Sequence, residues 1–199
     1  HKKFSEATAI LAGDALLTHA FFILSDPGDL FLEYPDASVR VNLTKIIAEA
    51  AGTRGMVEGQ MMDMQSFSGN KENTLSYLKK IHRLKTGRMI VSSVESGAVS
   101  VGADDKAIDQ LISYAKKIGL AFQVMDDILN IEGDPEILGK AVGSDKKNDK
   151  MTFPAIIGLS ESKKYAKKLV EDAIKALVKF DKKADPLRAL AEYIINRNH

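Results

Sequence analysis

The sequence predicts an all-α fold in a single domain spanning residues 1–199. Apolar residues recur at helical spacing along most of the chain, for example at Leu75, Leu78, Ile81 and Leu84. No run alternates polar and apolar residues with the two-residue period of a half-buried strand. The chain shows neither an internal repeat nor a linker that would divide it, and 199 residues suit one domain.

The expected helices can be placed in order along the chain. Residues 7–24 are apolar but contain Gly13, Asp14 and His19, so we expect a buried core helix and not a membrane span. The run of Asp, Pro and Gly within residues 25–29 indicates a turn. Helical spacing then predicts helices over residues 44–64, 71–101 and 104–131.

The last third of the chain combines a loop with two further helices. Residues 132–152 contain Gly133, Pro135, Gly139 and Gly143 among many charged residues, a composition typical of a loop or a short irregular helix. Residues 162–180 are amphipathic, with lysines on the polar face, and residues 185–196 are also expected to be helical.

The composition limits the class of protein. The 28 basic and 27 acidic residues give a net charge of +1, which argues against a nucleic-acid-binding surface. The absence of Cys excludes disulfides and thiolate metal sites, and it is compatible with a reducing cytoplasm. The four His residues are scattered, without the helical pairing that zinc would need. No signal peptide is seen, so we expect a cytoplasmic protein without membrane insertion.

The segment of residues 122–130, Phe-Gln-Val-Met-Asp-Asp-Ile-Leu-Asn, is the strongest chemical signal. At about 100° per residue, an apolar stripe runs along this helix. It consists of Leu111, Ala115, Ile118, Phe122, Met125 and Leu129. Measured from Leu111, Asp126, Asn130, Gln123 and Asp127 lie at about 60°, 100°, 120° and 160° and share one arc beside that stripe. Mg²⁺ accepts such oxygen ligands, although an Asp-Asp pair is also common on a solvated helix face.

Several segments, in the same order, resemble the trans-prenyltransferases of the polyprenyl diphosphate synthase family. The Phe-Gln-x-x-Asp-Asp-Ile-Leu segment is similar to the second aspartate-rich motif of that family. Further resemblance lies in residues 6–17, 55–63, 82–88 (His-Arg-Leu-Lys-Thr-Gly-Arg), 138–140 (Leu-Gly-Lys) and 150–154 (Lys-Met-Thr-Phe-Pro). Residues 190–199 resemble the C-terminus of bacterial farnesyl diphosphate synthases, so the resemblance covers the whole chain.

The resemblance implies an isoprenoid-synthase-type helical bundle around a central cavity, with Mg²⁺ as cofactor. It implies a prenyltransferase that condenses an allylic diphosphate (dimethylallyl or geranyl) with isopentenyl diphosphate, head to tail, and a homodimer. Farnesyl diphosphate is the favoured product. Geranylgeranyl diphosphate synthase and a truncated, non-catalytic partner subunit of a prenyl synthase remain alternatives. A class I terpene cyclase is disfavoured by the Lys-Thr-Gly and Leu-Gly-Lys matches.

The resemblance also implies roles for individual residues. Lys85 and Thr86 match residues that contact the allylic diphosphate, and Gln123, Lys140 and Lys150 match further diphosphate-binding residues. The neighbours of Lys150 depart from the usual family pattern, as does Asn130, which stands where the motif usually has its last Asp.

The resemblance also implies which residues bind the metal and which support the structure of the site. Asp126 and Asp127 are expected to hold Mg²⁺ and, with Lys85, to serve catalysis, while the uncharged amide of Asn130 would ligate more weakly. Two further sets of residues are expected to act in support. They are Gln60 and Asp63, which would hydrogen-bond the cavity wall, and Asp14, which would have a structural role.

The resemblance also concerns the part of a family member that precedes the segment at the start of this sequence. The resemblance implies that an earlier Asp-rich motif and an Arg-Arg-Gly loop, about the first third of a member, are absent. That part would supply the second metal-binding wall and most of the isopentenyl diphosphate site. We therefore expect these 199 residues alone to have little or no synthase activity.

Overall fold

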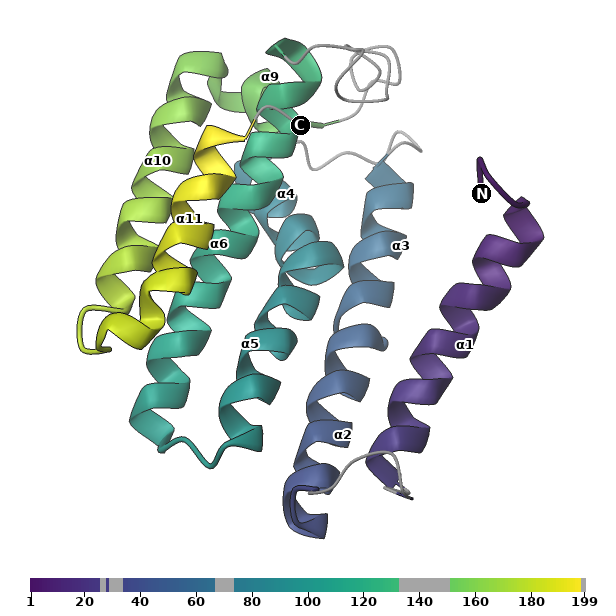
Figure 1. Ribbon diagram of the computed structural model, residues 1–199. Helices are drawn as coiled ribbons and strands as arrows, with labels where there is room; N and C mark the ends of the chain where they lie inside the picture. Colours follow the sequence, from purple (N-terminus) through teal and green to yellow (C-terminus); the bar gives the residue numbers. More distant parts are fainter. Residues whose placement is uncertain (26–27, 29–33, 67–73, 133–150, 198–199) are drawn as a thin grey trace. The chain divides into compact units, whose positions relative to one another are not determined.

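The computed structural model describes residues 1–25, 28, 34–66, 74–132 and 151–197. Two compact units make up the chain, His1–Ala48 and Glu49–His199, and each is described by itself. Both units are helical, and none of the described residues belongs to a strand (Figure 1). The prediction of an all-α fold is therefore confirmed, while the single domain stays a prediction.

The first unit holds helix α1 (Glu6–Ser25) and most of α2 (Ala37–Ala51). The Ser5 hydroxyl accepts a hydrogen bond from the Thr8 N–H at 3.1 Å and caps the start of α1. At the other end, Arg40 Nη1 donates to the carbonyls of Leu24 and Ser25 at 2.9 and 3.1 Å. These bonds satisfy carbonyl groups that the end of a helix leaves without a partner.

The prediction that residues 7–24 form a buried core helix is wrong for this structure. No residue of α1 is buried, and Ile10, Leu11 and Leu16 are mostly exposed. The physical reason is that the apolar side chains surround α1, so a single neighbouring helix in the unit leaves most of them uncovered. By length and composition α1 could also cross a membrane, a test that the core helices of soluble proteins pass as well.

The second unit contains the remaining helices, with α6 at its centre (Figure 1). Helix α6 packs against α10, α5, α11 and α9. The helices of this unit are α3 (Met56–Ser66), α4 (Leu75–His82), α5 (Arg88–Ser100), α6 (Asp105–Glu132), α9 (Phe153–Ile157), α10 (Leu159–Ala176) and α11 (Asp185–Asn196), with a π-helical turn η1 (Arg83–Gly87) and a 3-10 turn η2 (Lys182–Ala184).

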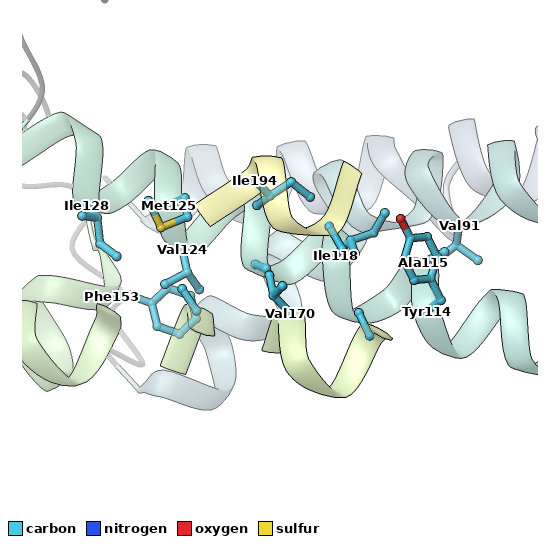
Figure 2. Close-up of a cluster of buried hydrophobic side chains, with 14 of the residues drawn as sticks. Val91, Tyr114, Ala115, Ile118, Val124, Met125, Ile128, Phe153, Val170 and Ile194 are labelled. Atoms are coloured by element: carbon cyan, nitrogen blue, oxygen red, sulfur yellow. The ribbon is translucent and has the colours of Figure 1, made fainter. Parts of the chain in front are cut away.

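Helix α6 is buried on more sides than the single stripe predicted from sequence. Ala115, Ile118 and Met125 of that stripe are buried, and so are Val124 and Ile128, which lie outside it (Figure 2). The reason is that α6 has helical neighbours on several sides, so more than one face contributes to the core. Asp127 is buried for the same reason, although a position bordering the stripe was expected.

Tyr114 ties α6 to α11 inside this core. Its side chain is fully buried, and its hydroxyl donates to the Leu187 carbonyl at 2.6 Å. Burial raises the pKa of Tyr114 to about 12, because the charged phenolate would lose its hydration.

The predicted helix over residues 44–64 is divided into α2 and α3 by a turn at residues 52–55. The Gly55 N–H donates to the Gly52 carbonyl at 3.0 Å. A Cβ at Gly55 would lie 2.1 Å from the Ala50 carbonyl oxygen, so the chain can turn here only with a glycine. The pattern missed this turn because Ala and Met on either side keep the helical spacing.

The boundaries of the later helices follow the prediction closely. Helix α11 has the predicted bounds, and α6 begins after Asp104, whose carboxylate accepts from the Ala107 N–H at 2.7 Å. Helix α10 starts and ends a few residues before the predicted 162–180. The described structure contains neither residues 133–150 nor most of the predicted turn at 25–29, so both predictions lie outside it.

Candidate functional site

The π-helical turn η1 carries Lys85 and Thr86 and is held closely between α3 and α6. A Cβ at Gly59 of α3 would lie 2.2 Å from the Lys85 backbone nitrogen and 2.6 Å from its Cα. On the other side, a Cβ at Gly119 of α6 would lie 3.3 Å from the Gly87 Cα. The glycines therefore let the backbones approach, and they fix a wide turn of a type that is frequent at functional sites.

Lys85 is paired with Asp63 across the contact between η1 and α3. Its Nζ lies 2.6 Å from Asp63 Oδ2. The Asp63 side chain is 13% exposed and the Lys85 side chain 33%. The mostly buried Asp63 carboxylate is stable here because the lysine neutralises it. The carboxylate in turn directs the Lys85 ammonium group toward α3.

Asp126 presents a carboxylate at the surface of α6 and is held from two sides. Its side chain is 43% exposed. Gln123 Nε2 donates to its Oδ2 at 3.2 Å, and the Arg197 guanidinium forms an ion pair with its Oδ1. Arg197 also donates to the Phe122 carbonyl at 3.1 Å and lies 4.0 Å from the centre of the Phe122 ring. Asp126 is thus oriented while it remains open to solvent.

Asp127 is turned inward, in contrast to its neighbour. Its side chain is 6% exposed, and its Oδ2 accepts from the Phe153 backbone N–H at 2.8 Å, at the start of α9. The Nε2 of His82 lies 3.6 Å from the same oxygen, and the His82 ring stacks on Phe153 with a centroid distance of 5.7 Å. Asp127 therefore joins α6 to α9 and lies beside α4.

The structure brings some of the predicted residues together and leaves others apart. Gln123 meets Asp126, whereas no hydrogen bond or ion pair within the described ranges links Lys85 to either carboxylate of the Asp-Asp pair. The other predicted residues fall into three groups. Thr86, Asn130 and Gln60 are half-buried, Asp14 is exposed, and Lys140 and Lys150 lie outside the described residues.

Among the described residues, one side chain at this site suits the role of a magnesium ligand. No group of three His, Asp or Glu side chains among the described residues comes close enough to hold a metal. Magnesium needs only one or two carboxylates when water and phosphate oxygens supply the rest of its octahedron. Asp126 fits that need because it is exposed, whereas one Asp127 oxygen is already engaged with the Phe153 N–H.

Three residues that contact the Asp126 and Asp127 side chains were given no role in the sequence analysis. They are His82, Phe153 and Arg197. Each lies in a segment that resembles the family, which is the only sequence signal for them. Their pairings could not be read from spacing, because Asp127 and Phe153 are 26 residues apart and Asp126 and Arg197 are 71 apart.

The fold and the site define the class of the protein, which is an all-helical protein with an oriented, half-exposed carboxylate on its central helix. Comparison with known protein families identifies the family within this class. The Polyprenyl synthetase family matches residues 1–194, and the chain belongs to this family.

Known relatives agree with the assignment. The chain is 44% identical over 199 residues to a farnesyl diphosphate synthase from Geobacillus stearothermophilus, and 42% identical over 200 residues to a geranylgeranyl diphosphate synthase from Cyanophora paradoxa. The match covers the whole of this chain and 65% of each relative. A geranyltransferase from Helicobacter pylori, solved with magnesium and isoprenyl diphosphate, is 31% identical with a TM-score of 0.77, over 98% of this chain and 62% of that one. The chain thus spans about two thirds of its relatives' length, and their fold confirms the predicted type.

Proposed function

We propose that the protein is a magnesium-dependent prenyltransferase. It would join isopentenyl diphosphate to dimethylallyl diphosphate to give geranyl diphosphate. It would then join a second isopentenyl diphosphate to geranyl diphosphate to give farnesyl diphosphate, releasing one pyrophosphate in each condensation. The single observation that carries the proposal is the half-exposed Asp126 carboxylate, oriented by Gln123 and Arg197 on the central helix of a polyprenyl synthetase fold. The magnesium and isoprenyl diphosphate bound in the Helicobacter pylori geranyltransferase support the same chemistry.

Each residue would act on the diphosphate group of the allylic substrate. Asp126 would hold magnesium, with Asp127 positioning the helix behind it. Lys85 and Thr86 would contact the diphosphate from η1, and Gln123 from α6. Lys140 and Lys150 would add positive charge, and Asn130 would be a weak, uncharged ligand. Lys85 would exchange its Asp63 partner for a phosphate oxygen, which an ammonium on a flexible stem can do.

The proposed reaction follows from charge. Magnesium, when bound, would neutralise the pyrophosphate as the C1–O bond of the allylic substrate breaks. Lys85 and Gln123 would stabilise the same developing negative charge. The double bond of isopentenyl diphosphate then attacks C1, and a proton is lost, so the product is five carbons longer. Apolar walls between the helices would keep water from the allylic cation.

The product length belongs to the proposal alone. Identity to the farnesyl and the geranylgeranyl synthase differs by too little to separate the two products. Farnesyl diphosphate is favoured by the C-terminal segment. A non-catalytic partner subunit is the second alternative, but it would leave Lys85, Gln123 and Asp126 without a role. A homodimer, a cytoplasmic location and the absence of membrane insertion are further parts of the proposal.

Activity should be tested in a chimera that joins this chain to the part of the Geobacillus stearothermophilus relative that it does not cover. We expect transfer of labelled isopentenyl diphosphate to geranyl diphosphate with magnesium, and none with EDTA. Asp126→Asn should lower kcat by about 100-fold, because a charged group facing the leaving group is lost. Asp109→Asn changes an exposed Asp on the same helix and should leave kcat unchanged. A folded chimera without turnover, or an unaffected Asp126→Asn variant, would refute the proposal.

A polypeptide of the 199 residues alone is expected to show little or no turnover in the same assay. The reason is that the sequence contains one Asp-rich motif of the two that the family resemblance implies. Turnover comparable to that of the chimera would contradict this expectation. Chromatography of the chimera's labelled product would distinguish farnesyl from geranylgeranyl diphosphate.

A further inference from the structure

A pocket that is separate from the residues proposed for catalysis lies within the unit Glu49–His199. Its volume is about 790 Å³, which is within the range of small-molecule sites. Six of its lining side chains are cationic, and no Asp or Glu lines it in the part of the chain that is described. The cations are Arg54, Lys79, Lys80, Arg83, Arg88 and Lys116.

Most of this positive charge is not neutralised by the protein. Lys80 pairs with Glu58 at 3.3 Å and Arg88 with Glu49 at 3.9 Å. Lys79 lies over the Tyr165 ring at 4.5 Å from its centre.

The other three cations are without such partners. The side chains of Arg54, Arg83 and Lys116 make no hydrogen bond or ion pair with any other residue that the structure describes. In addition, the buried Nε of Arg88 has no hydrogen-bond partner within these ranges. Like charges gathered in one concave site repel each other, and a bound multivalent anion would relieve that repulsion.

The remaining lining is apolar. Leu84, Val91 and Leu120 contribute side chains beside the cations. An arginine guanidinium group can donate two parallel hydrogen bonds to phosphate oxygens, and a lysine adds a point charge. An anion with several phosphate charges matches the cations, and an attached organic group would match the apolar part of the lining.

The pocket differs from the proposed catalytic site in position. None of Lys85, Thr86, Gln123, Asp126 or Asp127 lines it. On α6 its lining residues Lys116 and Leu120 lie about 15 and 9 Å along the axis from Asp126, and about 80° and 120° around it. Helix η1 contributes to both places, since Arg83 and Gly87 line the pocket while Lys85 points to Asp63.

We propose that this pocket is a second anion site, which binds the polyphosphate group of a small molecule. The site needs no metal, because the protein supplies the positive charge itself. Inorganic triphosphate and ATP are suitable probes, since they carry the same charged group without and with an organic part.

The test is isothermal titration of the 199-residue chain with each probe, in EDTA and at constant ionic strength. Arg83→Gln/Lys116→Gln removes two exposed, unpaired pocket cations. Lys106→Gln/Lys167→Gln is the matched control, because it removes two exposed lysines that lie outside the pocket lining. Circular dichroism should show that both variants are folded. We expect the pocket variant to bind triphosphate at least about tenfold more weakly, and the control to bind as the unaltered chain does.

Four outcomes would overturn the proposal. The first is that triphosphate binds no more tightly than sulfate. The second is that the pocket variant and the control lose the same amount of affinity for triphosphate. The third is loss of binding in Lys85→Gln with none in the pocket variant, which would place the anion at the catalytic site. Tighter binding of a short single-stranded RNA than of either probe would likewise overturn the assignment to a small molecule.

Discussion

The contact between Gly59 and the Lys85 backbone gives the sharpest prediction. In Gly59→Ala, the new Cβ would lie 2.2 Å from the Lys85 nitrogen and 2.6 Å from its Cα. Ordinary contact would require α3 and η1 to separate by roughly 1.2 Å. Both contacted atoms belong to the backbone, so no side-chain rotation can relieve the overlap. The contact itself should hold α3 against Lys85 and keep the Asp63 pair aligned.

The expected loss of stability can be estimated from two opposing effects. Overpacking against rigid atoms costs about 1–3 kcal/mol, and the upper end applies where the neighbours are backbone. Alanine gains about 1 kcal/mol over glycine inside a helix. The free energy of unfolding should therefore fall by about 2 kcal/mol, which moves the urea midpoint down by about 1 M for a slope of about 2 kcal/mol per M.

Gly97→Ala is the matched control for this experiment. Gly97 also lies inside a helix, α5, but a Cβ there would meet nothing within 4 Å. The same substitution should therefore stabilise the protein by about 0.5–1 kcal/mol. Urea unfolding followed by far-ultraviolet circular dichroism measures both variants. If Gly59→Ala were as stable as the unaltered protein, or if both changes shifted the midpoint in the same direction, the close packing of α3 on η1 would be wrong.

Two other predictions concern buried polar groups. Tyr114→Phe removes a hydroxyl that donates to the Leu187 carbonyl, and it should cost about 1–2 kcal/mol in urea unfolding at neutral pH. Because the pKa of Tyr114 is about 12 in the folded protein and about 10 unfolded, the unfolded state loses its proton first and stability falls between about pH 10 and pH 12. Tyr114→Phe should show a smaller alkaline loss, and an identical loss in both proteins would count against this burial effect. Asp127→Ala leaves the Phe153 N–H without its acceptor and should lower stability by about 1–3 kcal/mol in thermal unfolding. Asp126→Ala is its control and should cost less, since that side chain is 43% exposed, and the reverse order would contradict the assigned roles.

Sequence periodicity was enough to predict most of the helices. The bounds of α11 and the start of α6 follow from local signals such as the Asp104 cap, which need no knowledge of the rest of the fold. The turn at residues 52–55 was missed because a helix-compatible pattern surrounds it. The burial of α6 on several faces was missed because it depends on neighbours far along the chain.

The site shows the same division between local and distant information. The helical wheel correctly grouped Gln123 with Asp126, because these residues are three positions apart on one helix. It gave no indication that Asp127 would turn inward, since that depends on His82 and on Phe153 from other helices. It also gave no partner for Asp126, because Arg197 comes from a segment whose fold places it there.

The pairing of Asp126 with Arg197 has a consequence for the order in which the molecule is made. A ribosome synthesises Asp126 before its partner, which follows 71 residues later. At about 5–20 residues per second, this carboxylate would wait roughly 4–14 seconds for the guanidinium that orients it. Helix α6 could form early, but its surface group would reach its final geometry only when translation has passed Arg197. A nascent chain arrested before that point should therefore fold its central helix while its acidic group remains unconstrained.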